Sequence, residues 1–431
     1  MRKFLIGDIL TRVKDVVLIE DDKQYKRVTI RLYHQGVNLR DIEKGENIGT
    51  KRQYLVKPGQ FIMSRIDARN GAFGIIPEEL NDAIITNDFL TFKVNSEVVN
   101  IEYFNLLSKT KDFLSYCING STGTTNRKRL KEDLFLNFEI ELPSKEEQDS
   151  IIHKYNNIST KHRLLSENFR EQKILLERLR TSYKIDAING KYTKKGESHE
   201  SSIGLLEEIK KEKNRLIESG TIKKEKPLLP IEISEQEYDL PEGWTYARLG
   251  DLLNPINGKA FKPSDWSEEG LPIIRIQNLN NPDAPFNRCN FSVDSKYHVK
   301  KGDLLIGWSG TPGTSFGAFI WDREDALLNQ HIFKGVIYGD LVDKYFMQYA
   351  INSKLNEMIS KAHGGVGLKH ITKGKFMNLV IPLPPLKQQL EVVRMIKKAE
   401  YMFEQLEQNL IKSEGLGNLL LNSLLSLEQK R

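Results

Sequence analysis

The sequence predicts an α+β fold in which two similar mixed domains are separated by two long helices that pair as an antiparallel coiled coil. Two observations support this prediction. Short motifs of the first half return in the same order in the second half, and each half ends in a long amphipathic segment without an internal proline. A chain that repeats itself in this way is expected to use one scaffold twice.

The repeat is visible in six short motifs whose spacing between the two halves is nearly constant. Gly7–Leu10 returns as Gly250–Leu253, and Val56–Gln60 returns as Val299–Asp303. The other pairs are Asn87 with Asn329, Gly120–Gly123 with Gly364–Gly367, Leu142 with Leu383, and Gln148 with Gln389. Identities between the motifs are sparse, so we expect a shared fold with different surfaces. That suits one scaffold with two targets, although an old duplication without functional meaning would leave the same trace.

Each half divides into a mixed domain and a helical segment. β-branched runs such as Ile84–Thr86 predict short strands, and Ile101–Tyr116 and Val342–Ile359 each predict an amphipathic helix late in the domain. The expected boundaries are 1–143 for the first domain, 144–189 for the first long helix, 190–240 for a connector, 241–384 for the second domain and 385–431 for the second long helix.

The two helical segments are the most regular part of the sequence. Apolar residues recur every three or four positions from Ile152 to Tyr183 and from Leu390 to Leu424. At ~1.5 Å per residue, a helix from Gln148 to Tyr183 would extend about 54 Å, farther than one domain of this size can cover. Such a helix with a narrow apolar stripe needs a helical partner, and the other stripe is the simplest one. The alternative is that each stripe packs on its own domain.

The connector is charge-rich and poor in aromatic residues. We expect it to be solvated, with one short helix over Leu205–Leu216.

The composition permits a nucleic-acid partner without requiring one. The chain has 431 residues, with 64 Lys and Arg against 58 Asp and Glu and a net charge of +6. Its two cysteines, Cys117 and Cys289, cannot form a disulfide framework or a four-thiolate zinc site. No apolar run reaches the ~18 residues of a membrane span, and Asp8 interrupts the first run, so we expect a cytoplasmic protein with no membrane partner.

The sequence lacks the motifs of enzymes that modify DNA or move along it. It has no phosphate-binding loop, no polar-Pro-Pro-aromatic tetrapeptide with a glycine-rich cofactor turn, and no His-Glu-x-x-His metal motif. One weaker match, Asp283 and Asp294 with Lys296, could hold Mg²⁺, but a plain turn followed by a strand explains it as well. We therefore predict no catalytic residue, metal site or cofactor in this chain.

Candidate nucleic-acid contacts gather in two segments of the first half. Base edges are read mainly by Arg, Lys, Asn and Gln, whereas phosphates are held by cations, hydroxyls and backbone amides. One segment follows an apolar strand and contains Arg65, Arg69 and Asn70; Lys51 and Arg52 are further candidates for phosphate contacts. The other combines glycines and small hydroxyls with three consecutive cations, a mixture suited to phosphate, although a solvated loop would look similar. Its candidates are Ser121, Thr122, Thr124, Thr125, Asn126, Arg127, Lys128 and Arg129.

The repeat partners of these segments supply the candidates in the second half. The first partner is neutral and would bind through hydroxyls, amides and stacking of its indole, whereas the second keeps the glycines and adds cations and histidines. Their candidate residues are Trp308, Ser309, Thr311, Thr314, His363, Lys369, His370 and Lys373. A third segment runs from Arg275 to Asn278. Strand alternation would place Arg275 and Gln277 on one face of it, as an ordinary surface strand also would.

Three groups of residues make the chain similar to a known family. They are Leu240–Trp244 followed by Leu249–Asp251, then Arg65–Gly74, and finally Ile381–Gln389. With the duplication, they resemble the specificity subunit of a type I restriction-modification system over almost the whole length.

The resemblance implies a non-catalytic, sequence-specific DNA-binding subunit. In that family each of two target-recognition domains reads one half of a bipartite, asymmetric site on double-stranded DNA, and the long helices set the spacing and dock two methyltransferase subunits. Restriction subunits join this core, and S-adenosylmethionine, Mg²⁺ and ATP belong to the partner subunits. The residues alone leave two other hypotheses: a coiled-coil adaptor that binds no DNA, and a stand-alone Mg²⁺-dependent nuclease.

Overall fold

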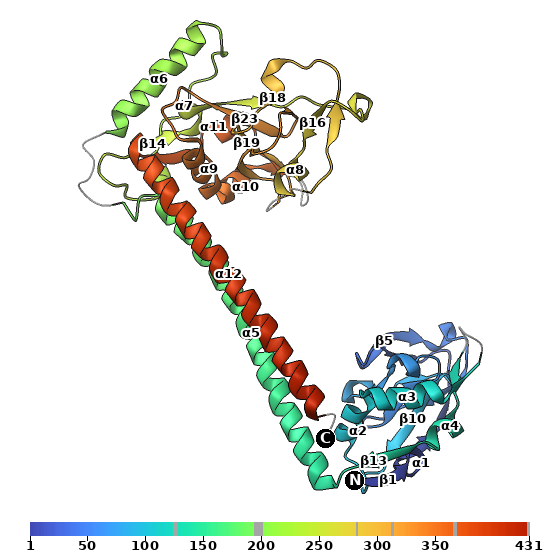
Figure 1. The fold of residues 1–431 in the computed structure, drawn as a ribbon. Helices are drawn as coiled ribbons and strands as arrows, with labels where there is room; N and C mark the ends of the chain where they lie inside the picture. The colour runs from blue at the N-terminus through green and yellow to red at the C-terminus, as the bar shows by residue number, and fades with distance from the viewer. Residues whose placement is uncertain (124–127, 194–200, 282, 312–313, 365–368, 429–431) are drawn as a thin grey trace. The chain divides into compact units, whose positions relative to one another are not determined.

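The computed structural model describes residues 1–123, 128–193, 201–281, 283–311, 314–364 and 369–428, with side chains described as far as Leu419. The chain forms two compact units, Met1–Arg170 with Lys412–Arg431, and Glu171–Ile411. Each unit contains one mixed domain and parts of both long helices (Figure 1). Helices and sheets occur together in both domains, which confirms the predicted α+β class. None of the described helices is both long enough and apolar enough to cross a bilayer.

The first domain is built on two sheets. A four-stranded antiparallel sheet has the order β2 (Leu10–Val13), β10 (Phe89–Val94), β7 (Phe61–Ser64), β8 (Phe73–Ile75). A five-stranded sheet has the order β3 (Asp15–Leu18), β6 (Arg52–Leu55), β9 (Ile84–Ile85), β4 (Gln24–Ile30), β5 (Val37–Lys44). Two short pairs are β1 (Arg2–Leu5) with β13 (Glu139–Leu142) and β11 (Ser121–Thr122) with β12 (Arg129–Leu130). The helices are α1 (Ile6–Ile9), α2 (Ile101–Ser108), α3 (Lys111–Asn119) and α4 (Glu132–Leu136).

The second domain repeats the four-stranded sheet and replaces the other one. The repeated sheet has the order β15 (Leu253–Asn257), β23 (Ile332–Ile337), β19 (Leu304–Gly307), β21 (Gly317–Ile320), and β14 (Thr245–Arg248) pairs with β26 (Val380–Leu383). The other sheets have the orders β17 (Asn287–Cys289), β16 (Leu271–Ile274), β22 (Ala326–Leu328), β18 (His298–Val299) and β20 (Ser309–Gly310), β25 (Lys369–His370), β24 (His363–Gly364). The helices are α7 (Leu249–Leu252), α8 (Ile276–Asn280), α9 (Lys344–Ser353), α10 (Leu355–Lys361) and α11 (Lys373–Met377). The long helices are α5 (Lys145–Ile188) and α12 (Leu386–Glu428), and α6 (Ser202–Glu218) lies in the connector.

Equivalent strand orders confirm the internal repeat. Even a turn is reproduced: Lys57 N donates to Gln60 Oε1 at 3.0 Å, and Lys300 N donates to Asp303 Oδ2 at 2.9 Å. The remaining sheets differ in strand number and order. The two domains therefore share one scaffold and differ beyond it, as predicted.

The structure corrects the alignment of two of the six motif pairs, Asn87 with Asn329 and Gly120–Gly123 with Gly364–Gly367. In the first domain Arg65 N, after β7, donates a hydrogen bond of 2.8 Å to Asp88 O, before β10. In the second domain Trp308 N, after β19, donates the equivalent bond of 3.2 Å to His331 O, before β23. This bond makes Gln330, not Asn329, the equivalent of Asn87. Gly123 and Gly364 share φ values of 131° and 137°, so these two glycines correspond. Both errors fall in loops, whose length and sequence vary more easily than those of strands.

The helix expected late in each domain is broken in two. In the first domain Thr110 begins a new helix, because its side chain accepts a hydrogen bond from Phe113 N at 3.2 Å. In the second, α9 ends before Lys354, whose Nζ lies 2.9 Å from Glu237 Oε2. Apolar periodicity continues across both breaks, and it therefore hides them in the sequence.

Aromatic rings fill the centre of the first domain. Phe104 packs edge-on against Phe61 and Phe113, with centroid distances of 5.0 and 5.7 Å. Cys117 lies in the same core, where burial raises the pKa of its thiol. Cys117 and Cys289 are both buried and unpaired.

A buried glutamine in the first turn of each long helix bonds that helix to its own domain. Gln148, in the first turn of α5, accepts from Asn100 N at 2.8 Å and donates to two backbone carbonyls at 3.0 and 3.2 Å. Gln389, in the first turn of α12, accepts from Asp343 N at 2.8 Å and donates to a carbonyl at 2.9 Å. Both glutamines are fully buried, and their partners Asn100 and Asp343 cap α2 and α9. One interaction therefore fixes the direction of each helix from its own domain.

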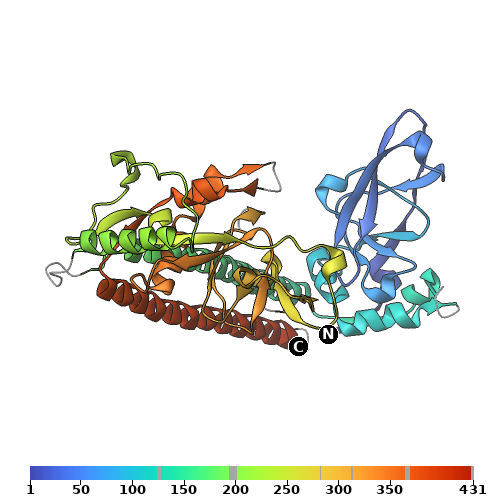
Figure 2. The same ribbon diagram turned by 90° about the horizontal axis from the view of Figure 1, so that it is seen from above.

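Helices α5 and α12 run in opposite directions against each other (Figures 1 and 2). In the second unit Lys184 Nζ lies 2.8 Å from Glu400 Oε1. In the first unit His162 Nε2 lies 2.6 Å from Asn418 Oδ1. Numbers that rise along one helix fall along the other, which confirms the predicted antiparallel pair. With 44 and 43 residues at ~1.5 Å each, the helices extend about 65 Å.

Parts of both helices also pack on the second domain; only for α12 is this its own domain, as the alternative interpretation proposed. Val392 and Ile396 from α12 lie in the core of the second domain, and Ala187 and Ile188 from the end of α5 join them there. Leu406 was expected inside the stripe but is 49% exposed. The start of α12 thus packs on its own domain, whereas α5 packs on the second domain at its end.

The connector helix is packed rather than solvated. Helix α6 confirms the helix expected over Leu205–Leu216, but Ile209 is fully buried and neighbouring leucines pack against the core of the second domain. Lys213 Nζ also donates to Gly250 O at 2.7 Å. Charged residues on the opposite face of the helix hid this packing in the sequence.

A second contact attaches the connector to β14. The guanidinium of Arg248, 3% exposed, forms two hydrogen bonds of 2.8 and 2.6 Å with the carboxylate of Glu235. It also donates to Leu229 O at 2.9 Å and Pro230 O at 2.6 Å. Hydrogen bonding to Arg248 lowers the pKa of Glu235 to about 2.

This ion pair predicts a pH-dependent contribution to stability. A folded pKa of about 2, below the usual 4.5, means that the pair stabilises the protein above pH 4.5 and that this contribution is lost as the pH falls toward 2. Glu235→Gln should lower the free energy of unfolding by about 1.5–3 kcal/mol at neutral pH, measured by urea denaturation. The difference from wild type should shrink with acid. Glu242→Gln, at an exposed carboxylate, is the control, and a pH-independent difference would contradict the assignment.

Candidate nucleic-acid interface

Two predicted segments of the first domain lie side by side. Strands β11 and β12 form a hairpin that is joined to the residue after β7, because Leu130 N donates to Arg65 O at 2.7 Å. Lys128 and Arg129 are exposed on this hairpin. Its other strand consists of Ser121 and Thr122. Thr124, Thr125, Asn126 and Arg127 lie outside the described residues.

Arg65 belongs to an ion cluster at the base of the hairpin. Its Nη2 lies 2.9 Å from Glu132 Oε2, and its Nε donates to Asn87 O at 3.1 Å. Arg12 Nε lies 3.4 Å from the other oxygen of Glu132, and burial lowers the pKa of Arg12. Two guanidinium groups share one carboxylate, so the cluster keeps a positive charge that favours phosphate.

Arg69 and Asn70 adjoin a turn that the sequence analysis missed. Tyr33 N donates to Asn70 O at 2.8 Å and His34 N donates to Gly71 O at 3.1 Å, so the turn between β4 and β5 packs on the turn at 67–71. Tyr33 is 73% exposed, and Tyr33 and His34 have φ values of 56° and 60°, a costly conformation for such residues. Within the described chain, Arg69 Nε is buried without a hydrogen-bond partner. The sequence signal for this turn was Gly36, which ends the turn between two predicted strands.

Two predicted cations are engaged in ion pairs elsewhere. Lys51 Nζ lies 2.5 Å from Asp21 Oδ1, and Arg52 follows at the start of β6. Lys373 Nζ lies 2.6 Å from Glu225 Oε1 at the root of α11. Contacts of these side chains with phosphate remain predictions, and they would compete with the ion pairs.

The second domain brings its predicted segments together in one small sheet. Strand β20 pairs with β25, which pairs with β24, so Ser309 lies opposite His370 and His370 opposite His363. His363 and His370 are exposed, and Lys369 is half-buried. Thr311 and Thr314 are exposed beside β20. This sheet is the counterpart of the β11–β12 hairpin and carries fewer cations.

Trp308 is packed inside the domain. Its indole stacks on Phe333 with a centroid distance of 5.2 Å and an interplanar angle of 17°. The ring of His331 lies 5.4 Å from it on a tilt. The indole is therefore not placed as the exposed stacking platform that the sequence suggested.

The strand expected over Arg275–Asn278 is absent, because β16 ends at Ile274 and α8 begins at Ile276. Asn278 causes the change. Its buried side chain accepts from Arg275 N at 3.0 Å and donates to Ala284 O at 3.0 Å, which closes a helical turn. Arg275 and Gln277 remain at the surface, whereas the amide of Asn278 is used within the domain.

The nuclease-like match is a capped turn. Asp294 Oδ1 accepts from Lys296 N at 3.1 Å, and its Oδ2 lies 2.9 Å from Lys296 Nζ. Hydrogen bonding to Lys296 lowers the pKa of Asp294. Among the residues that the structure describes, no three His, Cys, Asp or Glu side chains are grouped to hold a metal ion.

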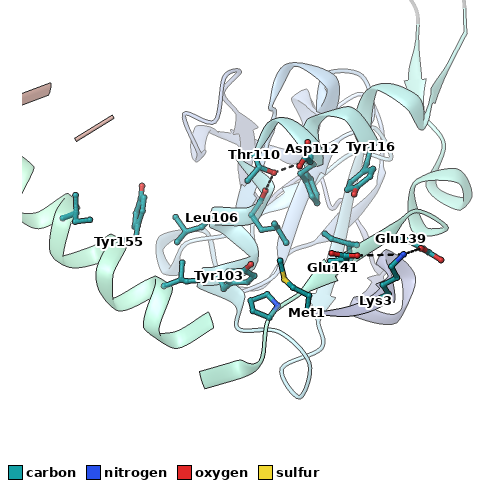
Figure 3. A pocket seen from close by; sticks show the side chains of 16 residues that line it. Met1, Lys3, Tyr103, Leu106, Thr110, Asp112, Tyr116, Glu139, Glu141 and Tyr155 are labelled. Carbon is teal, nitrogen blue, oxygen red and sulfur yellow. Dashed lines mark hydrogen bonds and ion pairs between the residues drawn. The ribbon is translucent and has the colours of Figure 1, made fainter. Parts of the chain in front are cut away.

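A cavity of about 620 Å³ in the first unit has a different character (Figure 3). Tyrosines and leucines of α2, α3 and α5 form its apolar wall. On the other side Lys3 Nζ lies 3.5 Å from Glu139 Oε2 and 4.0 Å from Glu141 Oε1, and Asp112 adds a third carboxylate. This acidic lining disfavours phosphate.

The two halves match the same family model. The model, described as "Type I restriction modification DNA specificity domain", covers residues 3–176 and again 241–413. The chain belongs to this family. The type I restriction enzyme EcoAI specificity subunit of Escherichia coli is 25% identical over 69% of this chain and 59% of that protein. The EcoEI specificity subunit, also from Escherichia coli, is 27% identical over 56% of this chain and 42% of that protein.

The chain spans less than two thirds of the length of these two specificity subunits. A solved structure, the HsdS subunit from Thermoanaerobacter tengcongensis, aligns over 99% of this chain and 96% of its own, with a TM-score of 0.55 and 17% identity. That likeness supports the fold, with its two specificity domains and paired long helices.

The exposed cations of the β11–β12 hairpin predict how DNA binding should depend on salt concentration. Lys128→Ala combined with Arg129→Ala should weaken binding to all DNA sequences about equally. Because fewer counterions are released, the slope of log K against log salt should fall by roughly one unit per lost phosphate contact. Lys57→Ala is the control, since Lys57 lies before the start of β7, whereas the hairpin joins the residue after the end of β7. An unchanged slope would remove the hairpin cations from the interface.

Proposed function

We propose that this protein is the non-catalytic DNA-reading subunit of a type I restriction-modification complex, with each domain reading one half of a bipartite asymmetric site on double-stranded DNA. The observation that carries the proposal is one scaffold, present twice, with two unlike surfaces. The hairpin of the first domain carries exposed cations beside the Arg12–Arg65 cluster. The equivalent sheet of the second domain presents histidines, hydroxyls and one lysine. Unlike surfaces on one frame suit unlike half-sites.

The long helices would set the spacing of the half-sites and dock two methyltransferase subunits. Large apolar side chains stay exposed after the helices pair: Leu175 and Leu179 on α5 are 59% and 57% exposed, and Tyr401 on α12 is 64% exposed. Exposed apolar surface on a helix pair favours further helices as partners. Restriction subunits would join this core in the cytoplasm, and S-adenosylmethionine, Mg²⁺ and ATP would be bound by the partner subunits.

Methylome sequencing tests this function directly. Cells that express the chain with its methyltransferase subunit should methylate one split, asymmetric sequence. Replacing residues 241–384 with the corresponding domain of another family member should change one half of that sequence and preserve the other half and the spacer.

The control is the unmodified chain without the methyltransferase subunit, which should methylate nothing. An adaptor that binds no DNA would give no sequence-specific methylation with the partner present. A change in both halves after replacement of one domain would contradict the assignment of one half-site to each domain.

A further inference from the structure

The second domain contains a polar cavity that joins part of the predicted segment Arg275–Asn278 to residues outside the predicted segments. It has a volume of about 420 Å³ and lies where the end of β16, the start of α8 and the turn between β22 and β23 meet. Phe261 and Trp266 form an apolar wall, and Arg275, Gln277 and Gln330 supply the polar groups. Trp266 is 44% exposed, so the cavity opens to solvent.

The polar groups of this cavity are not used by the protein itself. No hydrogen bond or ion pair within the described part of the chain engages the guanidinium of Arg275 or the side-chain amide of Gln330. Gln277 Nε2 reaches only Pro285 O, at 3.4 Å. The neighbouring Asn278, in contrast, is fully satisfied within the domain. Unused donors and acceptors that converge on a cavity are typical of a binding site.

The backbone holds these groups in place. Gln330 N donates to Lys259 O at 2.9 Å, which anchors the turn that carries the amide. His331 has a φ of 75°, a strained value that turns the chain sharply into β23. Trp308 N donates to His331 O at 3.2 Å, so the cavity adjoins the end of β19, directly before β20. The cavity therefore lies next to the strand end from which the chain enters β20.

The equivalent turn of the first domain carries different groups. Asn87 corresponds to Gln330, and its backbone carbonyl accepts from Arg65 Nε at 3.1 Å. The next residue, Asp88, lies 3.1 Å from Arg129 Nη1. A carboxylate held by the hairpin thus occupies the place where the second domain presents His331.

We infer that this cavity reads the major-groove edges of neighbouring purines, with Arg275 directed to guanine and Gln330 to adenine. The inference rests on the proposed function and adds determinants to the second half-site. A guanidinium pairs with O6 and N7 of guanine through two hydrogen bonds, and a glutamine amide pairs with N6 and N7 of adenine in the same way.

The test is binding of the chain, purified with its methyltransferase subunit, to duplexes in which each base pair of the second half-site is changed in turn. Arg275→Ala should abolish discrimination at one G·C pair, and Gln330→Ala at one A·T pair, each by roughly five- to 150-fold. Gln330→Glu should shift the preference at its position toward cytosine, because a carboxylate accepts from cytosine N4. Lys301→Ala, at an exposed lysine of the same domain, should leave discrimination unchanged.

Equal weakening on every duplex would mark a phosphate contact and overturn the inference, as would unchanged discrimination. Retained reading of the first half-site shows that a variant is folded and assembled. A variant that binds no duplex is replaced by Arg275→Lys, which keeps the charge without the paired geometry and must still lose selectivity at the same position. If the wild-type complex recognises no bipartite site, the proposed function fails instead.

Discussion

The attachment of each long helix to its domain depends on a buried glutamine. Gln148 and Gln389 place their amides between the first helical turn and the cap of α2 or α9, with donor and acceptor both satisfied. Loss of the glutamine amide would leave the backbone N–H of Asn100 or Asp343 without its partner, which costs about 1–3 kcal/mol. Because the same interaction occurs twice, each domain is mounted on its helix in the same way, whatever its surface carries.

The attachment of the long helices is the same in both domains and does not depend on the surfaces proposed for recognition. The four-stranded sheet, the helix roots and the short β1–β13 and β14–β26 pairs are the same in both domains, whereas the additional sheets differ. The groups that we propose for recognition lie at the ends of shared strands, after β7 and β19 and before β10 and β23. A rigid frame with variable strand ends allows new side chains at the surface without a change in core packing.

The repeat, the α+β class and the antiparallel helices could be predicted because they rest on spacing and periodicity, which survive substitution. Four features could not. Asn278 ends a strand through side-chain hydrogen bonds with residues several positions away. The packing of Trp308 on Phe333 and the burial of Ile209 depend on tertiary partners, and the pairing of Arg65 with Glu132 joins segments far apart in sequence. Single-residue chemistry identifies candidate contacts, but only the fold shows which of them the protein already uses.

We propose that the two paired helices, each fixed to its domain, determine the distance between the half-sites. The most direct measurement is the recognised sequence after insertion of seven residues in both helices, after Leu176 in α5 and after Gln408 in α12. Seven residues preserve the apolar stripe and add about 10 Å at ~1.5 Å per residue, or roughly three base pairs at ~3.4 Å each. We expect a spacer longer by that amount between two unchanged half-sites. An unchanged spacer, or altered half-sites, would contradict it.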